Sequence, residues 1–522
     1  MDKNINQSRR EFLKQAATAS GVAMAGSGIS ATALANRHPH PHETSLNYLD
    51  RNTYVDRMEV HGRFVIDPDA PGRGTSGKCN MMAVGEQRFL FKSGNVWDIT
   101  DPENAQIINA GGFRGGQLQL AYNPTLRKWI LLTGASTPTT SSHPNAANGK
   151  YDDPSLIQTA VNNPGLRGVR MWDATDPSDI RLLSEWSCDQ GDPSRTIQTG
   201  GGTHRDYYDG GRYAYLDTAP DNSFTRMEAP WRYYSHCLQI IDVENPAEPK
   251  FVSNWWFPGQ RMGEENAYRR WREYGDRSSW TSTHGGFYVP VKVENGGRYC
   301  YNSYGAFGHT IHDISEPANP TLASRWRPPY LPGAIPMHTT DCAWLATRGF
   351  VITNSEALNP DCFEPYHDNY IIDVRDPENQ QLLSTLPRWV PPEEAPYESF
   401  CDKRGRYGTH NPPHLKAPGR VNPNFTVYAS FNAGIQAMDI SDPTDPKLNG
   451  HFISPMGGDL TRYGSWNRTG NDVFVEWDRN LIWAGTDTGM YLLSHPDLGR
   501  PVLEPRPVTE WTLDRLNEGH DG

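Results

Sequence analysis

Several patterns that mark common functional classes are missing from the sequence. Its seven cysteines are scattered over 522 residues without a C-x-x-C pair, so neither a thiolate zinc site nor a redox dithiol is indicated. It also lacks a G-x-S-x-G elbow, a P-loop and a G-x-G-x-x-G turn, which leaves the α/β-hydrolase, nucleotide-hydrolysing and Rossmann interpretations without support. Apart from the N-terminal stretch, no segment approaches the ~20 apolar residues of a membrane span.

Positive charge is also scarce. The formal net charge is -12, which argues against nucleic acid as a partner because phosphate binding needs a basic surface. A small molecule, a glycan or a protein is the expected partner. The oligomeric state does not follow from the sequence.

Turn-forming and aromatic residues are abundant. The chain has 48 Gly, 42 Pro, 16 Trp and 24 Tyr, with 21% charged and 36% hydrophobic residues. This profile is typical of short strands joined by many turns rather than of long amphipathic helices. We therefore expect an all-β protein.

The N-terminal 35 residues resemble a twin-arginine export signal. Arg9 and Arg10 precede a mildly apolar, Ala/Gly-rich stretch, and Ala33-Leu34-Ala35 provides small residues for cleavage. An amphipathic helix is the alternative interpretation. The signal predicts a periplasmic or secreted protein that is exported folded, with residues 36–60 as its mobile N-terminus.

Six similar segments recur along the chain: GNVWDITDPENAQ, GVRMWDATDPSDI, LQIIDVENPAEPK, HTIHDISEPANPT, NYIIDVRDPENQQ and GIQAMDISDPTDPK. Each has an apolar strand that ends in Asp, a turn with Pro four residues later, and a second strand. The Asp can accept backbone N–H groups across the turn, and Pro restricts φ there. The spacing of about 55–75 residues is that of one four-stranded propeller blade, and a degenerate seventh unit, GMYLLSHPDLGRP, follows near residue 490.

These segments, especially GIQAMDISDPTDPKLNGHFISP and NYIIDVRDPENQ, resemble the repeats of LVIVD-repeat proteins. The resemblance implies a seven-bladed β-propeller over residues 61–505, followed by a peripheral tail at 506–522. It implies little about function, since propellers host binding proteins and enzymes alike. Whether the segment around residues 53–66 helps to close the ring stays open.

If the Asp turn joins the third and fourth strands of a blade, the following segment crosses to the next blade and begins its innermost strand. Four histidines lie at such starts, in THRDYYD, THGGFYV, HTTDCAW and HNPPHLK: His204, His284, His338 and His410. Four consecutive blades would each direct one imidazole toward the central channel. His414 is close enough to His410 to replace it.

Converging neutral imidazoles predict a site for a transition metal ion, with Fe, Cu or Mn favoured and one or two positions open for water or substrate. The alternative is that each ring only hydrogen-bonds neighbouring blades around the channel. Glu356 and Glu398 are candidates for orienting an imidazole or for acting as a general base. The alternative for both is a solvated loop carboxylate.

Long insertions on the same face predict a lid. One of them contains EENAYRRWREYGDRSSW, with Arg269 close before His284, and Arg205 directly follows His204. Either arginine could neutralise an acidic substrate. One or two disulfides are possible, and Cys342 and Cys362 form the nearest pair within one expected blade.

Three functions are compatible with these features. The favoured one is a metal-dependent oxidoreductase that acts on a small molecule. The second is a non-catalytic binding or scaffold propeller for a protein or glycan. The third is a polysaccharide lyase that uses His, Tyr and Arg, with Arg205 or Arg269 neutralising a uronate.

Overall fold

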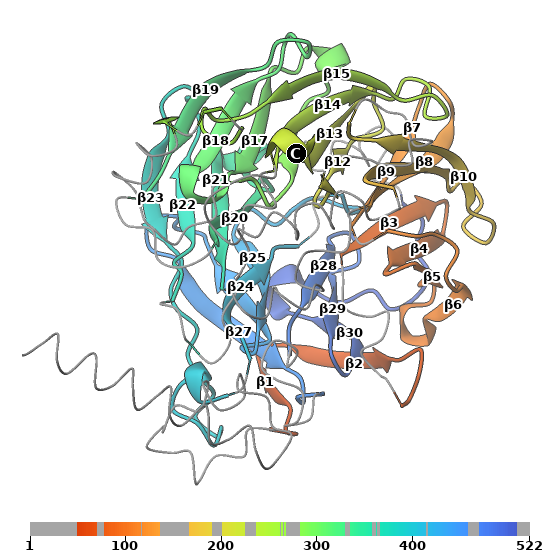
Figure 1. Ribbon diagram of the computed structural model, residues 1–522. Coiled ribbons are helices and arrows are strands. Elements are labelled where there is room, and N and C mark those ends of the chain that lie inside the picture. Colours follow the sequence, from red (N-terminus) through yellow and green to blue (C-terminus); the bar gives the residue numbers. More distant parts are fainter. Residues whose placement is uncertain are drawn as a thin grey trace, which may run out of the picture.

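The protein is a ring of seven antiparallel sheets arranged around a central axis (Figure 1). The computed structural model describes residues 50–69, 78–115, 117–135, 166–189, 201–224, 236–261, 263–264, 266–267, 282–328, 335–357, 362, 366–403, 405–413, 416–457 and 469–508. The prediction of an all-β, seven-bladed propeller is confirmed. Within the described part, no helix is long and apolar enough to cross a membrane.

Each blade runs from an innermost strand near the axis to an outer strand at the rim (Figure 1). Blade 1 contains β3 (Cys79–Val84), β4 (Gln87–Lys92), β5 (Asn95–Asp98) and β6 (Gln106–Asn109). Blade 2 contains β7 (Leu118–Asn123), β8 (Lys128–Ala135), β9 (Gly168–Asp173) and β10 (Arg181–Ser187). Blade 3 contains β11 (Gly202–Thr203), β12 (Tyr207–Tyr208), β13 (Tyr213–Ala219), β14 (Cys237–Asp242) and β15 (Lys250–Trp255).

The remaining blades follow the same order. Blade 4 contains β16 (Phe287–Tyr288), β17 (Tyr299–Ser303), β18 (His309–Asp313) and β19 (Thr321–Trp326). Blade 5 contains β20 (Ile335–Asp341), β21 (Phe350–Glu356), β22 (Tyr370–Asp373) and β23 (Gln381–Thr385). Blade 6 contains β24 (Tyr407–Asn411), β25 (Phe425–Phe431), β26 (Ile435–Asp439) and β27 (Lys447–Ile453), and blade 7 contains β28 (Asp472–Glu476), β29 (Leu481–Thr486) and β30 (Gly489–Ser494).

Helices in the described part are single turns. The α-helix with both ends described is α5 (Leu345–Arg348). The 3₁₀ turns are η1 (Pro102–Asn104), η4 (Asn222–Phe224), η6 (Val293–Asn295), η7 (Gly305–Phe307), η8 (Phe400–Asp402) and η9 (Pro496–Leu498).

The repeated Asp and Pro organise the turn between the third and fourth strands, as the sequence predicts. Each Asp carboxylate accepts the backbone N–H two residues later, at 2.8–3.1 Å, in the six turns that begin at Asp98, Asp173, Asp242, Asp313, Asp373 and Asp439. This bond replaces a ladder bond that the turn cannot make.

The prolines of these turns also join neighbouring blades, which the sequence does not reveal. A serine on the outer strand of one blade donates its hydroxyl to the Pro carbonyl of the next blade at 2.5–2.7 Å, in the pairs Ser184–Pro246, Ser253–Pro317, Ser324–Pro377 and Ser384–Pro443. Between these rim contacts, buried apolar side chains of adjacent sheets pack face to face.

The N-terminal segment supplies two outer strands. β1 (Tyr54–Asp56) pairs with β27 and adds a fifth strand to blade 6, while β2 (Glu59–Phe64) pairs with β30 and completes blade 7. Figure 1 shows β2 in red-orange beside the blue β30. A strand from the N-terminal part of the sequence therefore closes the ring, so the segment around residues 53–66 does help to close it. β1 lies within residues 36–60, the range that the sequence predicts to be a mobile N-terminus.

Buried ion pairs stabilise the seam between blade 7 and blade 1. Glu476 lies 3.0 Å from Arg88 and 2.7 Å from Arg479, and it accepts the indole N–H of Trp483 at 2.6 Å. The side chains of Glu476, Arg88 and Arg479 are fully buried. A carboxylate removed from water in this way needs all of these partners.

The disulfide joins Cys362 to Cys401, and Cys342 is a buried free thiol. The pairing suggested by sequence proximity, Cys342 with Cys362, is therefore wrong. Cys342 directly follows β20 and packs in the core between blades, whereas Cys401 lies in η8, within the long connection between blades 5 and 6. Distance along the sequence therefore did not predict the Cys362–Cys401 disulfide, which joins two separate segments.

Replacing the seam carboxylate, Glu476→Gln, is expected to lower the free energy of unfolding by about 3–5 kcal/mol at pH 7, because two buried guanidinium groups lose their counter-charge. Burial alone would raise the pKa of Glu476, but Arg479 and Arg88 lower it below its usual value. The stabilisation is therefore complete above the unfolded pKa of about 4.3 and is lost as the pH falls below it.

Urea unfolding of wild type and variant at pH 7 and pH 3.5 measures this effect, with the expected difference shrinking at the lower pH. Glu185→Gln removes a more exposed pair with Arg170 and should change stability by at most about 1 kcal/mol. Equal effects of the two substitutions would contradict the role given to the seam.

Candidate metal centre

Four histidines form a row where the innermost strands of blades 3 to 6 approach the axis. His204 directly follows β11, and His284 lies three residues before β16. His338 and His410 lie within β20 and β24. The ring centroids are 4.3 Å apart for His204 and His284, 5.0 Å for His284 and His338, and 5.4 Å for His338 and His410.

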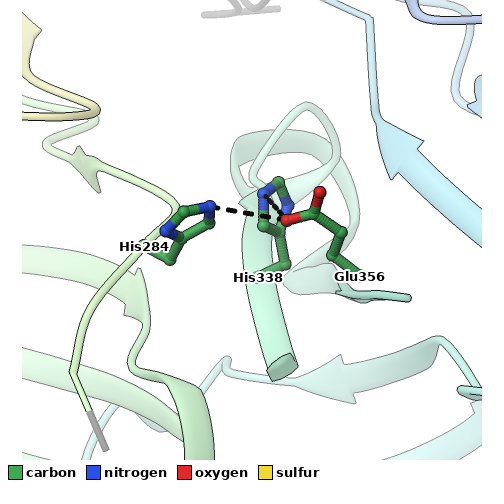
Figure 2. A group of neighbouring side chains, drawn as sticks. All are labelled: His284, His338 and Glu356. Atoms are coloured by element: carbon green, nitrogen blue, oxygen red, sulfur yellow. Dashed lines mark ion pairs between the residues drawn. The ribbon is translucent and has the colours of Figure 1, made fainter. Parts of the chain in front are cut away.

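The carboxylate of Glu356 faces this row from the end of β21. Its Oε2 lies 3.4 Å from His284 Nε2 and 3.2 Å from His338 Nε2 (Figure 2). Its Oε1 lies 3.7 Å from His410 Nε2. His338 is fully buried and the Glu356 side chain is 5% exposed, but His284 is 16% exposed, so solvent reaches the cluster at His284.

The spacing of these atoms fits the ligand shell of a metal ion. Metal–ligand bonds of about 2.0–2.1 Å place neighbouring ligand atoms about 3.3 Å apart in tetrahedral geometry and about 2.9 Å apart in octahedral geometry. One ligand atom each from His284, His338 and Glu356 lies within 4.8 Å of the other two. His338 Nε2 and Glu356 Oε2 are buried and, within the described part of the chain, make no hydrogen bond.

Neighbouring side chains hold two of these groups in orientation. Arg406 donates from Nη1 to Glu356 Oε1 at 2.7 Å, which leaves Oε2 facing the imidazoles. Thr339 Oγ1 lies 2.7 Å from His338 Nδ1 and can accept a proton carried by Nδ1, the tautomer in which Nε2 keeps its lone pair. Such outer contacts are typical of metal-binding His and Glu residues.

His410 is held differently. Its Nδ1 lies 3.2 Å from the backbone carbonyl of Asn471 and 3.0 Å from Asn411 Nδ2. Arg205 can only donate, so its contact with Nε2 places the ring proton of neutral His410 on Nδ1, where the Asn471 carbonyl accepts it. His410 Nε2 then accepts from Arg205 Nη2 at 3.3 Å. The ring stacks on Phe431, with centroids 4.5 Å apart, and Phe431 has φ of 44°, a strained value for a bulky residue.

The protonation states suit metal ligands. Burial, followed by the charge of Arg205, holds the pKa of His338 well below its usual value, and burial also lowers the pKa of His284. Burial would raise the pKa of Glu356, but the histidines and Arg406 outweigh it and hold the pKa well below its usual range. Because the pKa values of His284 and His338 are lowered, both rings are neutral at pH 7, and the carboxylate of Glu356 faces them with the guanidinium of Arg406 at 2.7 Å.

Two glycines allow the inner strands to approach each other. A Cβ at Gly285 would overlap with the backbone carbonyl of His338 on the next blade. Gly286 has φ of 67°, and a Cβ there would lie 2.9 Å from the carbonyl of Arg205 on the preceding blade. The sequence THGG therefore places His284 in contact with blades 3 and 5.

The other candidate residues from the sequence lie elsewhere or outside the described part. Glu398 is exposed, just before η8, and is not part of the cluster. Arg205 is 3% exposed and contacts His410. His414, Arg269 and most of the expected lid fall outside the described residues.

Sequence reasoning missed Arg406 and the position of Glu356 between the histidines. Glu356 is predicted from the sequence to orient an imidazole or to act as a general base, whereas in the structure its Oε2 lies 3.2–3.4 Å from two imidazole nitrogens, in a group that could hold a metal ion. Its place at the end of a second strand, beside an innermost strand that carries His338, was the signal that could have indicated this.

Taken together, these features define a seven-bladed propeller with a His/Glu cluster on its axis. The LVIVD repeat family model matches residues 295–327 and 421–453, so the chain carries LVIVD repeats. The two matches cover the second to fourth strands of blades 4 and 6. A search of curated proteins found no match.

Gly285→Ala is expected to lower the free energy of unfolding by at least about 2 kcal/mol, because the added methyl group must push two inner strands apart. Urea unfolding followed by tryptophan fluorescence measures the change. Gly85→Asn is the matched control: an added Cβ at Gly85 meets nothing within 4 Å, and Asn tolerates the φ of 60° found there. An unchanged stability of Gly285→Ala would show that the close approach is not required.

Proposed function

We propose that the protein is a metal-dependent oxidoreductase in which His284, His338 and Glu356 bind a redox-active divalent ion. The supporting observation is a largely buried cluster in which two imidazole nitrogens each lie 3.2–3.4 Å from one carboxylate oxygen, with all three atoms within 4.8 Å of one another. Two His and one carboxylate with open positions are the donor set of non-haem Fe(II) oxygenases. Fe is therefore the first candidate, with Cu and Mn as alternatives.

The flanking histidines would shape the open side of this centre. His204 stacks on His284 with ring centroids 4.3 Å apart, and burial together with His284 holds the pKa of His204 well below its usual value. A neutral ring beside the metal can add a ligand or accept a proton. His410, hydrogen-bonded by Arg205, would orient a substrate or that arginine.

A bound redox ion would supply electron transfer to O₂ or to a small-molecule substrate. The protein's own residues would do the rest. Arg406 keeps Glu356 ionised and oriented, and Thr339 would accept a proton from Nδ1 of His338, which leaves Nε2 for the metal ion. Solvent exposure at His284 provides the side from which a substrate could enter.

We further propose that the protein is exported folded through the twin-arginine route to the periplasm or beyond. Support comes from the signal-like sequence of residues 1–35 and from the Cys362–Cys401 disulfide, since disulfides persist in oxidising compartments. Export in the folded state would allow the metal to be inserted before export.

A polysaccharide lyase is the second candidate. Arg205 lies beside His410, and Arg205 and Tyr207 line the same cavity. A cation that could neutralise a uronate is therefore close to groups that could move its α-proton. Incubation with polygalacturonate and alginate, followed by ultraviolet absorbance of unsaturated products, tests it. Absence of products from both polymers would exclude these substrates.

The metal proposal predicts that the metal-free protein binds one Mn(II) or Fe(II) per chain, measured by calorimetry under argon. His338→Ala and Glu356→Gln should each weaken binding by about 100-fold or more, because each removes a ligand, and Arg406→Lys by about 10–100-fold through loss of orientation. His61→Gln is the control, since this histidine lies on β2 at the rim and contacts Ser494.

Unchanged affinity in both ligand variants would contradict the proposal. The redox part is tested separately: Fe(II)-loaded wild type should consume O₂ with one or more members of a panel of small carboxylic and phenolic acids, and Glu356→Gln should not. Metal binding without any oxygen uptake would contradict the oxidoreductase activity and indicate a metal-binding protein.

A further inference from the structure

A cavity of about 70 Å³ adjoins the metal centre on the propeller axis, and residues from the innermost region of all seven blades line it. At about 10–15 Å³ per water molecule, it has room for about five waters, the size of a small organic molecule. Arg205 connects the cavity to the row of histidines, because it lines the cavity and donates a hydrogen bond to His410. We call this cavity the axial chamber.

The axial chamber carries more positive than negative charge. Three cationic side chains line it: Lys78, Arg205 and Lys416. The lining carboxylates are Asp206 and Asp472, and Asp472 already pairs with Lys92 at 3.1 Å. Burial raises the pKa of Asp206 well above its usual value, which favours its neutral form, and burial lowers the pKa of Lys78 and of Lys416 to about 7. With Asp206 neutral and Asp472 paired, the permanent charge of Arg205 leaves the chamber positive near pH 7.

Within the described part of the chain, neither Arg205 nor Lys78 forms an ion pair with a carboxylate. Arg205 is 3% exposed; its Nη1 donates to Asn411 at 2.9 Å, but no described residue accepts from its buried Nε. No described residue hydrogen-bonds the ammonium of Lys78, and burial, followed by the charge of Arg205, lowers its pKa to about 7. A buried guanidinium N–H without an acceptor is costly, so an acceptor within the chamber would satisfy it.

The remaining wall is aromatic and apolar. Tyr207, Phe287 and Tyr288 line one part, and Pro412 and Pro413 another. Ligand sites commonly combine such walls with a few polar groups that fix orientation. The chamber thus favours a ligand with one anionic head and an apolar body over a compact, fully charged anion.

We propose that the axial chamber binds a small monocarboxylic acid with an apolar or aromatic body, whose carboxylate meets Arg205 and Lys78. This inference rests on the proposed function in one respect, since it makes that acid the substrate of the neighbouring metal centre. The binding itself does not require the metal.

Calorimetry on the metal-free, full-length protein tests the proposal with benzoate as the probe. Benzoate should bind, and benzamide, its neutral analogue, should bind at least 10-fold more weakly. Lys78→Met should weaken benzoate binding at least 10-fold, while Lys78→Arg should retain it. Lys128→Met is the control, because Lys128 is half exposed and pairs with Asp173 on the surface.

Equal affinity for benzoate and benzamide would overturn the proposal, as would tighter binding of inorganic phosphate than of benzoate. The comparison of benzoate with benzamide uses the wild-type protein, so it tests the proposal even if Lys78→Met does not fold. Glu356→Gln should still bind benzoate. Wild-type protein that binds benzoate but no metal ion would refute only the metal centre, and wild-type protein that binds the metal ion but not benzoate would refute only the chamber.

Discussion

The buried carboxylate of Glu356 is the constraint on which the centre of this propeller depends. An ionised carboxylate removed from water costs several kcal/mol unless other groups compensate for it. Here Arg406 contributes a full positive charge at 2.7 Å to Oε1, and the proposed metal ion would compensate Oε2, which lies 3.2–3.4 Å from the Nε2 atoms of His284 and His338. These side chains come from blades 4, 5 and 6, so the charge can be accommodated only when the three inner strands are held in register.

The rest of the fold provides that register. At the rim, Asp-capped turns and serine–proline hydrogen bonds repeat from blade to blade, and at the seam Glu476 holds blade 7 against blade 1. Near the axis, Gly285 lets neighbouring backbones approach where a side chain would separate them. The contacts at the rim thus repeat from blade to blade, whereas the side chains near the axis differ between blades. A binding site can therefore form at the axis without a change in the architecture.

The same division explains what could be predicted. The rim repeats every 55–75 residues or so, so a local Asp–Pro pattern was sufficient for the blade count. The positions of His204, His284, His338 and His410 at inner strands followed from the order of strands within each blade. Contacts between distant segments did not. Cys362 and Cys401 lie in separate connections, and the addition of β1 and β2 depends on closure of the ring.

Anomalous diffraction at the iron, copper and manganese edges, from crystals of protein purified after export by its native host without a metal-binding tag, tests the central claim most directly. We expect one strong peak about 2.0–2.3 Å from His284 Nε2, His338 Nε2 and Glu356 Oε2. Crystals that diffract well and show no peak among these three atoms at any of the edges would contradict the account.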